Sequence, residues 1–334
     1  MPSLGRRSTV RPRGRAGPDG PRAAELGAAL AERLGRLLDD RGELLAGVVG
    51  LVMASEGRPL SPDPRPPPST VVVAACVSAG GAWRRALWPA VAVECALAAA
   101  DVFDDVADRE TEAYPAGLGE GVLLIGAGGL LALAGHAVLR ADEDGLPDET
   151  VLALGRLLGA ELARAADGQA RALQTPPADA VDAYRLSAHK SGPLGALGAR
   201  LGARCATADA DLLSLYAAYG WHLGVFSQLM NDARDAAPGG STRKRDVRDG
   251  RPTVPLVFTE SAPAPEDLRG RALAAWEARQ RRRIAAEGGI VAAYALAQAE
   301  RLRALEALDE LARLGRPVRR LRDLLGPEIA SPIA

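Results

Sequence analysis

The residues most capable of chemistry form two stripes of acidic and amide side chains on apolar segments. The first stripe contains Asp101, Asp104, Asp105 and Asp108, whose spacing places them on one helical face. Because the preceding run CALAAA indicates a core helix, neighbouring carboxylates there repel one another unless cations neutralise them. Hard oxygen ligands without nearby histidine or cysteine suit Mg²⁺. The first stripe therefore predicts a magnesium site.

The second stripe lies more than a hundred residues later and repeats the same spacing. Its members are Gln228, Asn231, Asp232 and Asp235. A dense cationic loop follows, comprising Arg243, Lys244, Arg245, Arg248 and Arg251. A single acidic stripe is more often a solvated helix face. Two stripes on apolar helices, with basic side chains beside them, instead predict a receptor for a metal-bound diphosphate.

Nearly the whole chain has the hydrophobic period of amphipathic or buried helices. A short β-branched run, Thr70–Val73, continues into AACVSA and is interpreted as the start of a buried helix after a proline stop. The later helices are expected at 84–109, 119–140, 147–172, 178–203, 207–236, 253–260, 265–284 and 288–313. No sheet is expected. The sequence predicts an all-α protein.

Composition excludes several classes of protein. The 334 residues are 48% hydrophobic and 25% charged, with a net charge of −1, so neither wholesale disorder nor a nucleic-acid partner is indicated. We interpret residues 1–22 as a disordered basic tail and residues 23–334 as one domain. The longest apolar stretch, Gly121–Arg140, is glycine-rich and contains His136, so no membrane span is expected. Three scattered cysteines and no secretory signal indicate a cytoplasmic protein.

Five elements of the sequence resemble the motifs of the trans-isoprenyl diphosphate synthase (polyprenyl synthetase) family. Asp104-Asp105-Val106-Ala107-Asp108 matches its DDxxD motif, and the segment from Phe226 to Asp235 resembles its second aspartate-rich motif. Gly168-Gln169 and His189-Lys190-Ser191-Gly192 resemble two elements between these motifs. The segment Arg245–Leu256 is similar to the loop GKDLxEGKxTxPL. The resemblance covers about residues 25–325.

This resemblance implies the helical isoprenoid-synthase bundle, an Mg²⁺-dependent enzyme and a homodimer. It implies three Mg²⁺ ions, held by Asp104, Asp105, Asp108, Asn231, Asp232 and Asp235. It further implies that Lys190, Gln228 and Arg245 bind the diphosphate of an allylic substrate, with Asp104, Asp105, Lys190 and Arg245 as the catalytic group. Cations around a leaving diphosphate stabilise the charge that develops on it.

The second half of the family's site, which binds isopentenyl diphosphate, does not match. Its basic motif would lie near Asp63–Pro68, where Arg65 is the one cation, and Leu97 stands where the family has histidine or glutamine. Its arginine pair would lie within Arg109–Tyr114, where acids intervene. Losing several charge-assisted bonds weakens binding by orders of magnitude.

We therefore predict a class I terpene synthase, which captures the allylic cation within the substrate. Three alternatives stay open: a chain-elongating prenyl diphosphate synthase, a prenyltransferase to a non-isoprenoid acceptor, and a non-catalytic partner subunit.

Small residues before the first stripe favour a long substrate tail. Ala99 and Ala100 stand where the resemblance implies bulky residues in short-chain enzymes, so a twenty-carbon substrate such as geranylgeranyl diphosphate is expected. Phe103, Trp221 and Phe226 are candidates to stabilise a carbocation through their ring faces, although aromatic residues on core helices more often only pack.

Overall fold

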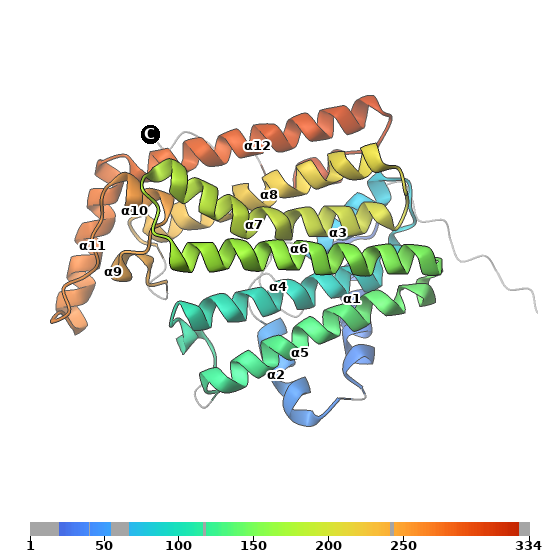
Figure 1. The fold of residues 1–334 in the computed structure, drawn as a ribbon, viewed down its shortest axis with the longest axis horizontal. Helices are drawn as coiled ribbons and strands as arrows, with labels where there is room; N and C mark the ends of the chain where they lie inside the picture. The colour runs from blue at the N-terminus through green and yellow to red at the C-terminus, as the bar shows by residue number, and fades with distance from the viewer. Residues whose placement is uncertain (1–19, 40, 55–66, 116–117, 241–243, 327–334) are drawn as a thin grey trace, which may run out of the picture.

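A computed structural model describes residues 20–39, 41–54, 67–115, 118–240 and 244–326. Across these ranges the chain forms helices and no strand (Figure 1). The α-helices are α1 (Ala23–Leu38), α2 (Glu43–Met53), α3 (Ser69–Ser78), α4 (Leu87–Ala107), α5 (Glu120–Leu139), α6 (Asp148–Gln174), α7 (Ala180–Arg204), α8 (Ala210–Ala236), α9 (Asp246–Asp249), α10 (Val254–Phe258), α11 (Gly270–Ala286), α12 (Gly289–Arg313) and α13 (Arg319–Asp323). Short 3₁₀ turns occupy Trp83–Ala86, Thr111–Ala113 and Arg140–Asp144.

The predicted all-α class is confirmed, and most helix ends lie within a few residues of their expected positions. The segment expected at 119–140 is α5, and the buried helix expected from Thr70 is α3. The amphipathic pattern that follows Arg22 is divided between α1 and α2, because Gly42 adopts an extended conformation before α2. The short helices α9 and α13 were not predicted. Most of the predicted tail, residues 1–19, lies outside the described residues.

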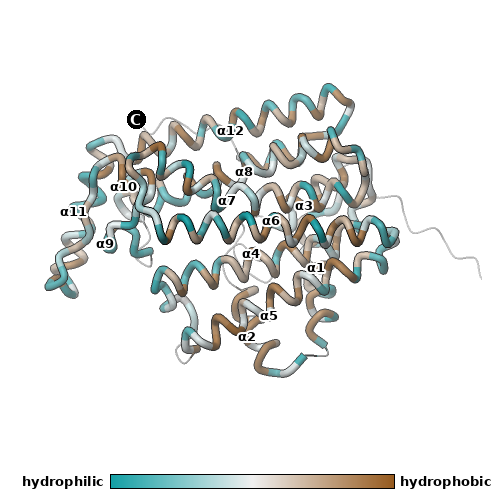
Figure 2. The backbone as a smooth tube through the Cα atoms, viewed as in Figure 1, coloured by the Kyte–Doolittle hydropathy of each residue, from teal (hydrophilic) through white to brown (hydrophobic). Residues whose placement is uncertain are grey.

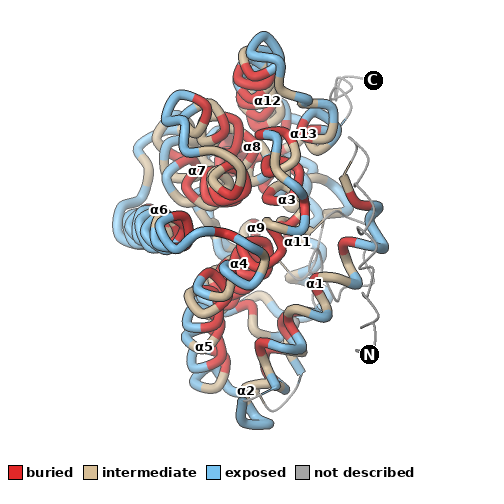
Figure 3. The backbone as a smooth tube through the Cα atoms, turned by 90° about the vertical axis from the view of Figure 1, so that its right-hand side faces the viewer, coloured by how far each residue is buried: buried red, intermediate tan, exposed pale blue. Residues whose placement is uncertain are grey.

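The long helices lie side by side around α4. In the view of Figure 1, α12, α8, α7, α6, α4 and α5 succeed one another from top to bottom, with α9 and α11 at the left end. The closest pairs of helices include α7 with α8, α8 with α12, α6 with α7, and α4 with α5. Figure 3 shows that the buried residues gather where α3, α4, α7 and α8 face one another. The C-terminal ends of α4 and α8 and the start of α7 thus approach the same end of the bundle.

Small side chains allow this close packing. From Leu87 to Ala99 on α4 nearly every side chain is buried, and five of these residues are alanines. The tightest approach is between α7 and α8, where a Cβ on Gly195 would lie 2.1 Å from the Gly220 carbonyl oxygen and 2.9 Å from the Gly224 Cα. Backbone therefore contacts backbone at this crossing. This contact fixes the site residues of α7 relative to those of α8.

Aspartates begin both of these helices. The Asp179 carboxylate accepts from the backbone N–H groups of Val181 and Asp182 at the start of α7. The Asp209 carboxylate accepts in the same way from Asp211 and Leu212 at the start of α8. These bonds satisfy N–H groups that have no partner within a helix.

Two described segments are long and apolar enough to cross a membrane by length and composition, which corrects the expectation that none would be. They are Trp83–Ala107, with 78% of its most apolar window buried, and Glu120–Asp144, with 44% buried. Figure 2 shows the hydrophobic character of α5 and of the adjoining α2. Core helices pass the same test, so this is weak support for a span.

Candidate active site

Three helices converge on the carboxylate of Asp104, near the end of α4. Lys190 Nζ, from α7, donates to Asp104 Oδ1 over 2.6 Å. Gln169 Nε2, from α6, donates to the same oxygen over 2.7 Å. Gly168 makes this possible, because a Cβ there would lie 2.2 Å from the His189 carbonyl oxygen on α7. The structure thus brings together Asp104 and Lys190, which are 86 residues apart in the sequence.

Asp105 and Asp108 each have a basic partner in the loop before and after α9. Lys244 Nζ lies 3.4 Å from Asp105 Oδ1, and Arg251 Nη1 lies 3.2 Å from Asp108 Oδ2. The Tyr114 hydroxyl also donates to Asp105 over 2.9 Å. The basic loop therefore folds back onto the first stripe, as the sequence predicted for its cations in general.

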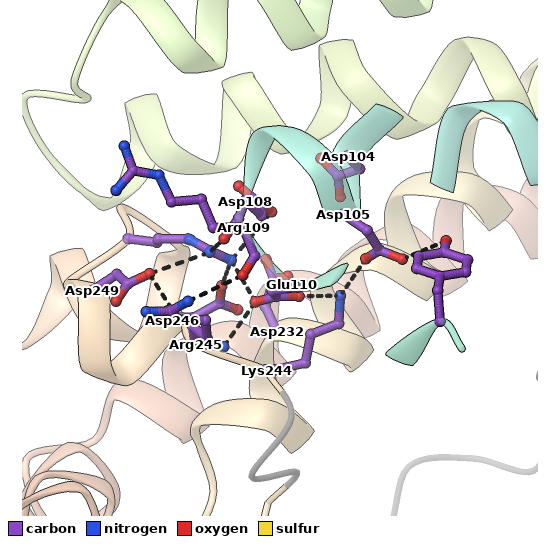
Figure 4. A network of polar contacts seen from close by, with 12 residues as sticks. Asp104, Asp105, Asp108, Arg109, Glu110, Asp232, Lys244, Arg245, Asp246 and Asp249 are labelled. Atoms are coloured by element: carbon purple, nitrogen blue, oxygen red, sulfur yellow. Dashed lines mark hydrogen bonds and ion pairs between the residues drawn. The ribbon is translucent and has the colours of Figure 1, made fainter. Parts of the chain in front are cut away.

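Glu110 lies at the centre of this network (Figure 4). Its side chain is 4% exposed and accepts from Lys244 Nζ at 2.8 Å, from Arg251 Nη1 at 2.6 Å and from the Arg245 backbone N–H at 2.8 Å. Burial alone would raise the pKa of Glu110, but these hydrogen bonds outweigh it, so the pKa is lowered. Glu110 is therefore held as a carboxylate.

The second stripe has fewer cationic neighbours. Asp232 is 5% exposed and accepts from Gln228 Nε2 over 2.8 Å, while Gln228 Oε1 accepts from the Ser191 hydroxyl on α7 over 3.2 Å. Burial raises the pKa of Asp232 to about 7, and the nearby carboxylate of Asp246 contributes to this shift. Burial likewise raises the pKa of Asp235, again with a contribution from Asp246. Asp232, Asp235 and Asp246 thus form a second acidic group.

Two carboxyls of the first stripe also have raised pKa values. Burial raises the pKa of Asp108 to about 6, repulsion from Asp104 adds to the shift, and Arg251 opposes it. Burial also raises the pKa of Asp105, although Lys244 and Tyr114 oppose it. Because burial is the main cause of these shifts, an added cation would favour the ionised forms of both carboxyls.

Two of the predicted site residues make other contacts than the predicted ones. Asn231 is exposed and accepts from the Arg234 guanidinium over 3.0 Å on its own helix. The Arg245 guanidinium donates to the Arg109 carbonyl oxygen over 3.0 Å and lies 3.5 Å from Asp249. The backbone N–H of Arg245, rather than its side chain, contacts Glu110. The metal role of Asn231 and the diphosphate role of Arg245 stay predictions.

The predicted hydrophobic residues lie in varied surroundings. Ala99 is fully buried in the core cluster around α4, while Ala100 is half-buried. Phe103 is 37% exposed. Trp221 is half-buried, meets His189 edge-on and lies against Gly192, and the register of α8 puts it on the same face as Gln228. Phe226 packs against two core clusters, which favours the packing interpretation for that residue.

Several residues that were not predicted individually as site residues lie here: Glu110, Tyr114, Gln169, Lys244, Asp246 and Arg251. Lys244 and Arg251 belonged to the recognised cationic loop, and Gln169 to a recognised motif. Glu110 carried no signal, since an acid next to an acidic stripe resembles any solvated helix end. Arg65, which was considered for a second diphosphate, lies outside the described residues.

The donors present suit a hard divalent cation. Within the described ranges, no group of three or more His, Cys, Asp or Glu side chains is already arranged around a common metal position. The first stripe contacts Lys190, Lys244 and Arg251 instead. Burial, with smaller contributions from neighbouring carboxylates, raises the pKa values of Asp108 and Asp232, so a bound cation would favour their ionised forms. Carboxylate oxygens in this state are ligands that Mg²⁺ prefers.

Comparison of the structure with solved structures gives strong matches over nearly the whole chain. A polyprenyl synthetase from Streptomyces coelicolor A3(2) has a TM-score of 0.71 at 22% identity, covering 91% of this chain and 97% of that one. A geranylgeranyl pyrophosphate synthase has a TM-score of 0.76 at 16% identity, covering 91% and 96%. A polyprenyl synthase from Caulobacter crescentus CB15, complexed with calcium and isoprenyl diphosphate, has a TM-score of 0.71 at 22% identity, covering 94% and 96%.

No protein-family model matches the sequence, and no curated protein does. The structural matches establish that the chain has the all-α isoprenoid-synthase fold, as predicted.

Proposed function

We propose that this chain is a divergent member of the trans-isoprenyl diphosphate synthase family and an enzyme that binds and ionises an allylic prenyl diphosphate. The observation that carries the proposal is the convergence of Lys190, Lys244 and Arg251 on the carboxylates of α4, opposite the second acidic group of α8. Cations and acidic groups mixed at one end of a bundle fit a diphosphate bound through Mg²⁺. The structural neighbours support this choice, because their names are those of prenyl diphosphate synthases.

Mg²⁺ would be held by Asp104, Asp105, Asp108, Asn231, Asp232 and Asp235, with three ions implied by the family resemblance. Bound there, Mg²⁺ would act as a Lewis acid on the diphosphate oxygens. Lys190, Gln228 and Arg245 remain the proposed diphosphate ligands, and the structure adds Lys244 and Arg251 as candidates. Their N–H groups would stabilise negative charge on the departing pyrophosphate as the allylic C–O bond breaks. The Asp232 carboxyl must lose its proton before it can bind a metal.

The structurally similar proteins favour chain elongation as the reaction of the allylic cation. Each of the three neighbours described above is named as a synthase or synthetase of prenyl or polyprenyl products, and each is covered almost completely. In this reaction the double bond of isopentenyl diphosphate attacks the cation, a proton is lost, and the product keeps a diphosphate. The small residues Ala99 and Ala100 support a twenty-carbon chain length for the product or the substrate.

Cyclisation by a class I terpene synthase is the second candidate, and one observation favours it. Where the resemblance implies cations for a second diphosphate, the structure has the buried carboxylate of Glu110 and the Tyr114 hydroxyl bonded to Asp105. A carboxylate that already engages Lys244 and Arg251 disfavours a second diphosphate nearby. The same observation is compatible with transfer of the prenyl group to a non-isoprenoid acceptor.

We further propose a homodimer located in the cytoplasm. The support for a dimer is the apolar side chains that α5 exposes, including Leu124 (41%), Ile125 (77%) and Leu139 (65%). The support for a reducing compartment is that Cys76, Cys95 and Cys205 are buried and form no disulfide. Light scattering of the purified protein at several concentrations measures the oligomeric state directly.

The deciding experiment incubates the purified protein and Mg²⁺ with geranyl, farnesyl or geranylgeranyl diphosphate, each with and without isopentenyl diphosphate. Both the hexane extract and the remaining diphosphates are analysed. A longer diphosphate formed only with isopentenyl diphosphate establishes chain elongation, whereas a hydrocarbon or alcohol formed without it establishes a terpene synthase. Release of no pyrophosphate in any mixture would contradict allylic ionisation by this protein alone.

A further inference from the structure

The C-terminal end of α4 has an unusual backbone conformation that aims Glu110 back toward the bundle. Arg109 has a φ of 56°, in the left-handed region that glycine usually occupies. Its N–H donates to the Val106 carbonyl oxygen at 3.1 Å, and the Glu110 N–H donates to the Asp105 carbonyl oxygen at 2.8 Å. These two bonds form a Schellman motif, which ends the helix and reverses the chain. The direction of Glu110 is therefore fixed by the helix that carries the first stripe.

From that position Glu110 contacts three parts of the basic loop at once. It accepts from the Lys244 side chain, the Arg245 backbone and the Arg251 side chain, at 2.8, 2.8 and 2.6 Å. The loop is thus fastened to α4 at its beginning and at its end, across a separation of 134 to 141 residues in the sequence. Charge-assisted bonds to a buried carboxylate are among the stronger polar contacts in proteins.

The two side-chain cations also reach the first stripe. Lys244 Nζ lies 2.8 Å from Glu110 and 3.4 Å from Asp105. Arg251 Nη1 lies 2.6 Å from Glu110 and 3.2 Å from Asp108. If Asp105 and Asp108 turn their oxygens to a metal, Glu110 still holds both cations beside them. Without Glu110, the loop would keep the bonds from Arg245 and Arg251 to the carbonyl oxygens of Arg109 and Asp108, but it would lose its buried carboxylate partner.

We propose that Glu110 is a positioning residue that anchors the basic loop to α4 and so holds Lys244 and Arg251 beside the diphosphate site. Its role is to preorganise the cations before the diphosphate arrives, which lowers the cost of ordering them on binding. The binding consequence rests on the proposed function. The anchoring of the loop does not, and a separate measurement tests it.

Limited trypsin digestion tests the anchor without any substrate. The loop offers cleavage after Lys244, Arg245 and Arg248, and mass spectrometry identifies cuts there. Glu110→Gln keeps the shape of the side chain but removes its charge, so we expect cleavage within residues 244–251 to accelerate about tenfold, since exposure of the loop follows its local opening.

The matched control for this variant is Glu161→Gln. Glu161 is also nearly buried and also engages two arginines, Arg200 at 2.5 Å and Arg164 at 3.1 Å, but it joins α6 to α7 away from the loop. We expect its loop cleavage to match that of the wild type. Equal loop cleavage in the wild type and Glu110→Gln would overturn the anchor. If Glu110→Gln does not fold, Glu110→Asp, which keeps the charge but withdraws it from the loop, is compared in its place.

Calorimetric titration with inorganic pyrophosphate and Mg²⁺ tests the binding consequence. We expect Glu110→Gln to bind at least about tenfold more weakly than the wild type, Glu110→Asp to recover part of the loss, and Glu161→Gln to stay within about twofold. Tighter binding by Glu110→Gln would mean that Glu110 competes with the diphosphate, and would overturn the proposal. Absence of pyrophosphate binding by the wild type would instead contradict the proposed function, and the trypsin pattern would still decide the anchor.

Discussion

The two acidic stripes occupy different electrostatic surroundings although their sequences look alike. Three carboxylates of the α4 stripe have a basic neighbour: Lys190 for Asp104, Lys244 for Asp105 and Arg251 for Asp108. On α8, the hydrogen-bond donor to Asp232 is the neutral amide of Gln228, and the pKa of Asp232 is raised to about 7. Asp104, Asp105 and Asp108 are therefore partly neutralised by basic side chains, whereas the α8 group depends more on an external cation or a proton. The α4 stripe therefore holds the basic side chains in place, and the α8 group has the greater need for a metal ion.

The largest expected effect is on catalysis, from Asp104→Ala. This change removes the shared acceptor of Lys190 and Gln169 at the junction of three helices. We expect turnover of the allylic diphosphate to fall by about 10²–10³-fold or more, a loss typical of removing a preorganised charged group. Release of pyrophosphate measures it. Asp167→Ala, which removes an exposed partner of Arg171, is the control and should leave turnover unchanged. Wild-type turnover without Mg²⁺ in the Asp104 variant would contradict the metal assignment.

The next effect concerns the pH dependence of stability in metal-free protein. The folded-state pKa of Asp232, about 7, lies above its ordinary value of 3.8, so the folded state binds the proton more tightly. The contribution of Asp232 to the free energy of unfolding is complete below pH ~4. It is lost as the pH rises through about 7, and the total loss is at most ~4 kcal/mol. Asp232→Asn should therefore be more stable than the wild type at pH 8.

Thermal unfolding at pH 5 and pH 8, with a chelator present, measures this difference. The wild type should lose more stability than Asp232→Asn between the two pH values, and Mg²⁺ should stabilise the wild type more at pH 8. If the thermal stability of the two proteins changed equally with pH, Asp232 would not be the destabilising carboxylate, and the electrostatic difference between the α4 and α8 groups would be contradicted.

The contact between α7 and α8 can be broken at Gly195. A Cβ there would lie 2.1 Å from the Gly220 carbonyl oxygen, so Gly195→Ala must separate the two backbones. We expect a loss of about 1–3 kcal/mol in the free energy of unfolding, typical of overpacking. Chemical denaturation measures it. Gly159→Ala, on an open face of α6 with no atom within 4 Å of the added Cβ, should be neutral or slightly stabilising.

The smallest effect is expected from Arg109→Gly. Because Arg109 has a φ of 56°, glycine should relieve the cost of the left-handed conformation and stabilise the protein by about 0.5–1 kcal/mol. The contacts of Glu110 should persist, so pyrophosphate binding should not change. Arg156→Gly, on the exposed side of α6, should instead cost about 1 kcal/mol. Destabilisation by Arg109→Gly would mean that the Arg109 side chain itself supports the end of α4.

Helix content and the main chemical elements could be predicted from the sequence because they depend on local patterns. The period of apolar residues located α4 to α8 and α12 within a few residues, and prolines and glycines marked most of their ends. The spacing of Asp104, Asp105 and Asp108 required a shared face on any helix. Lys190 was predicted through the family resemblance to bind the diphosphate, and the structure places its Nζ 2.6 Å from Asp104 Oδ1.

Other features depended on contacts between distant segments. Asn231 and Asp232 are adjacent in the sequence and share the predicted motif, yet Asn231 is exposed and Asp232 is buried. The choice of Lys244 and Arg251 over the Arg245 side chain at the α4 stripe follows from the path of the loop around α9. No local pattern specifies that path.

The sequence by itself determined an all-α chain with two acidic stripes and a basic loop, because periodicity and side-chain type are properties of neighbouring residues. Only the tertiary structure decided that Glu110 would join the loop to the first stripe. That role requires a reversed chain at Arg109 and the close approach of segments more than 130 residues apart. It arises because burial makes an unpaired carboxylate costly, so the fold supplies Glu110 with cations that no local sequence rule would assign to it.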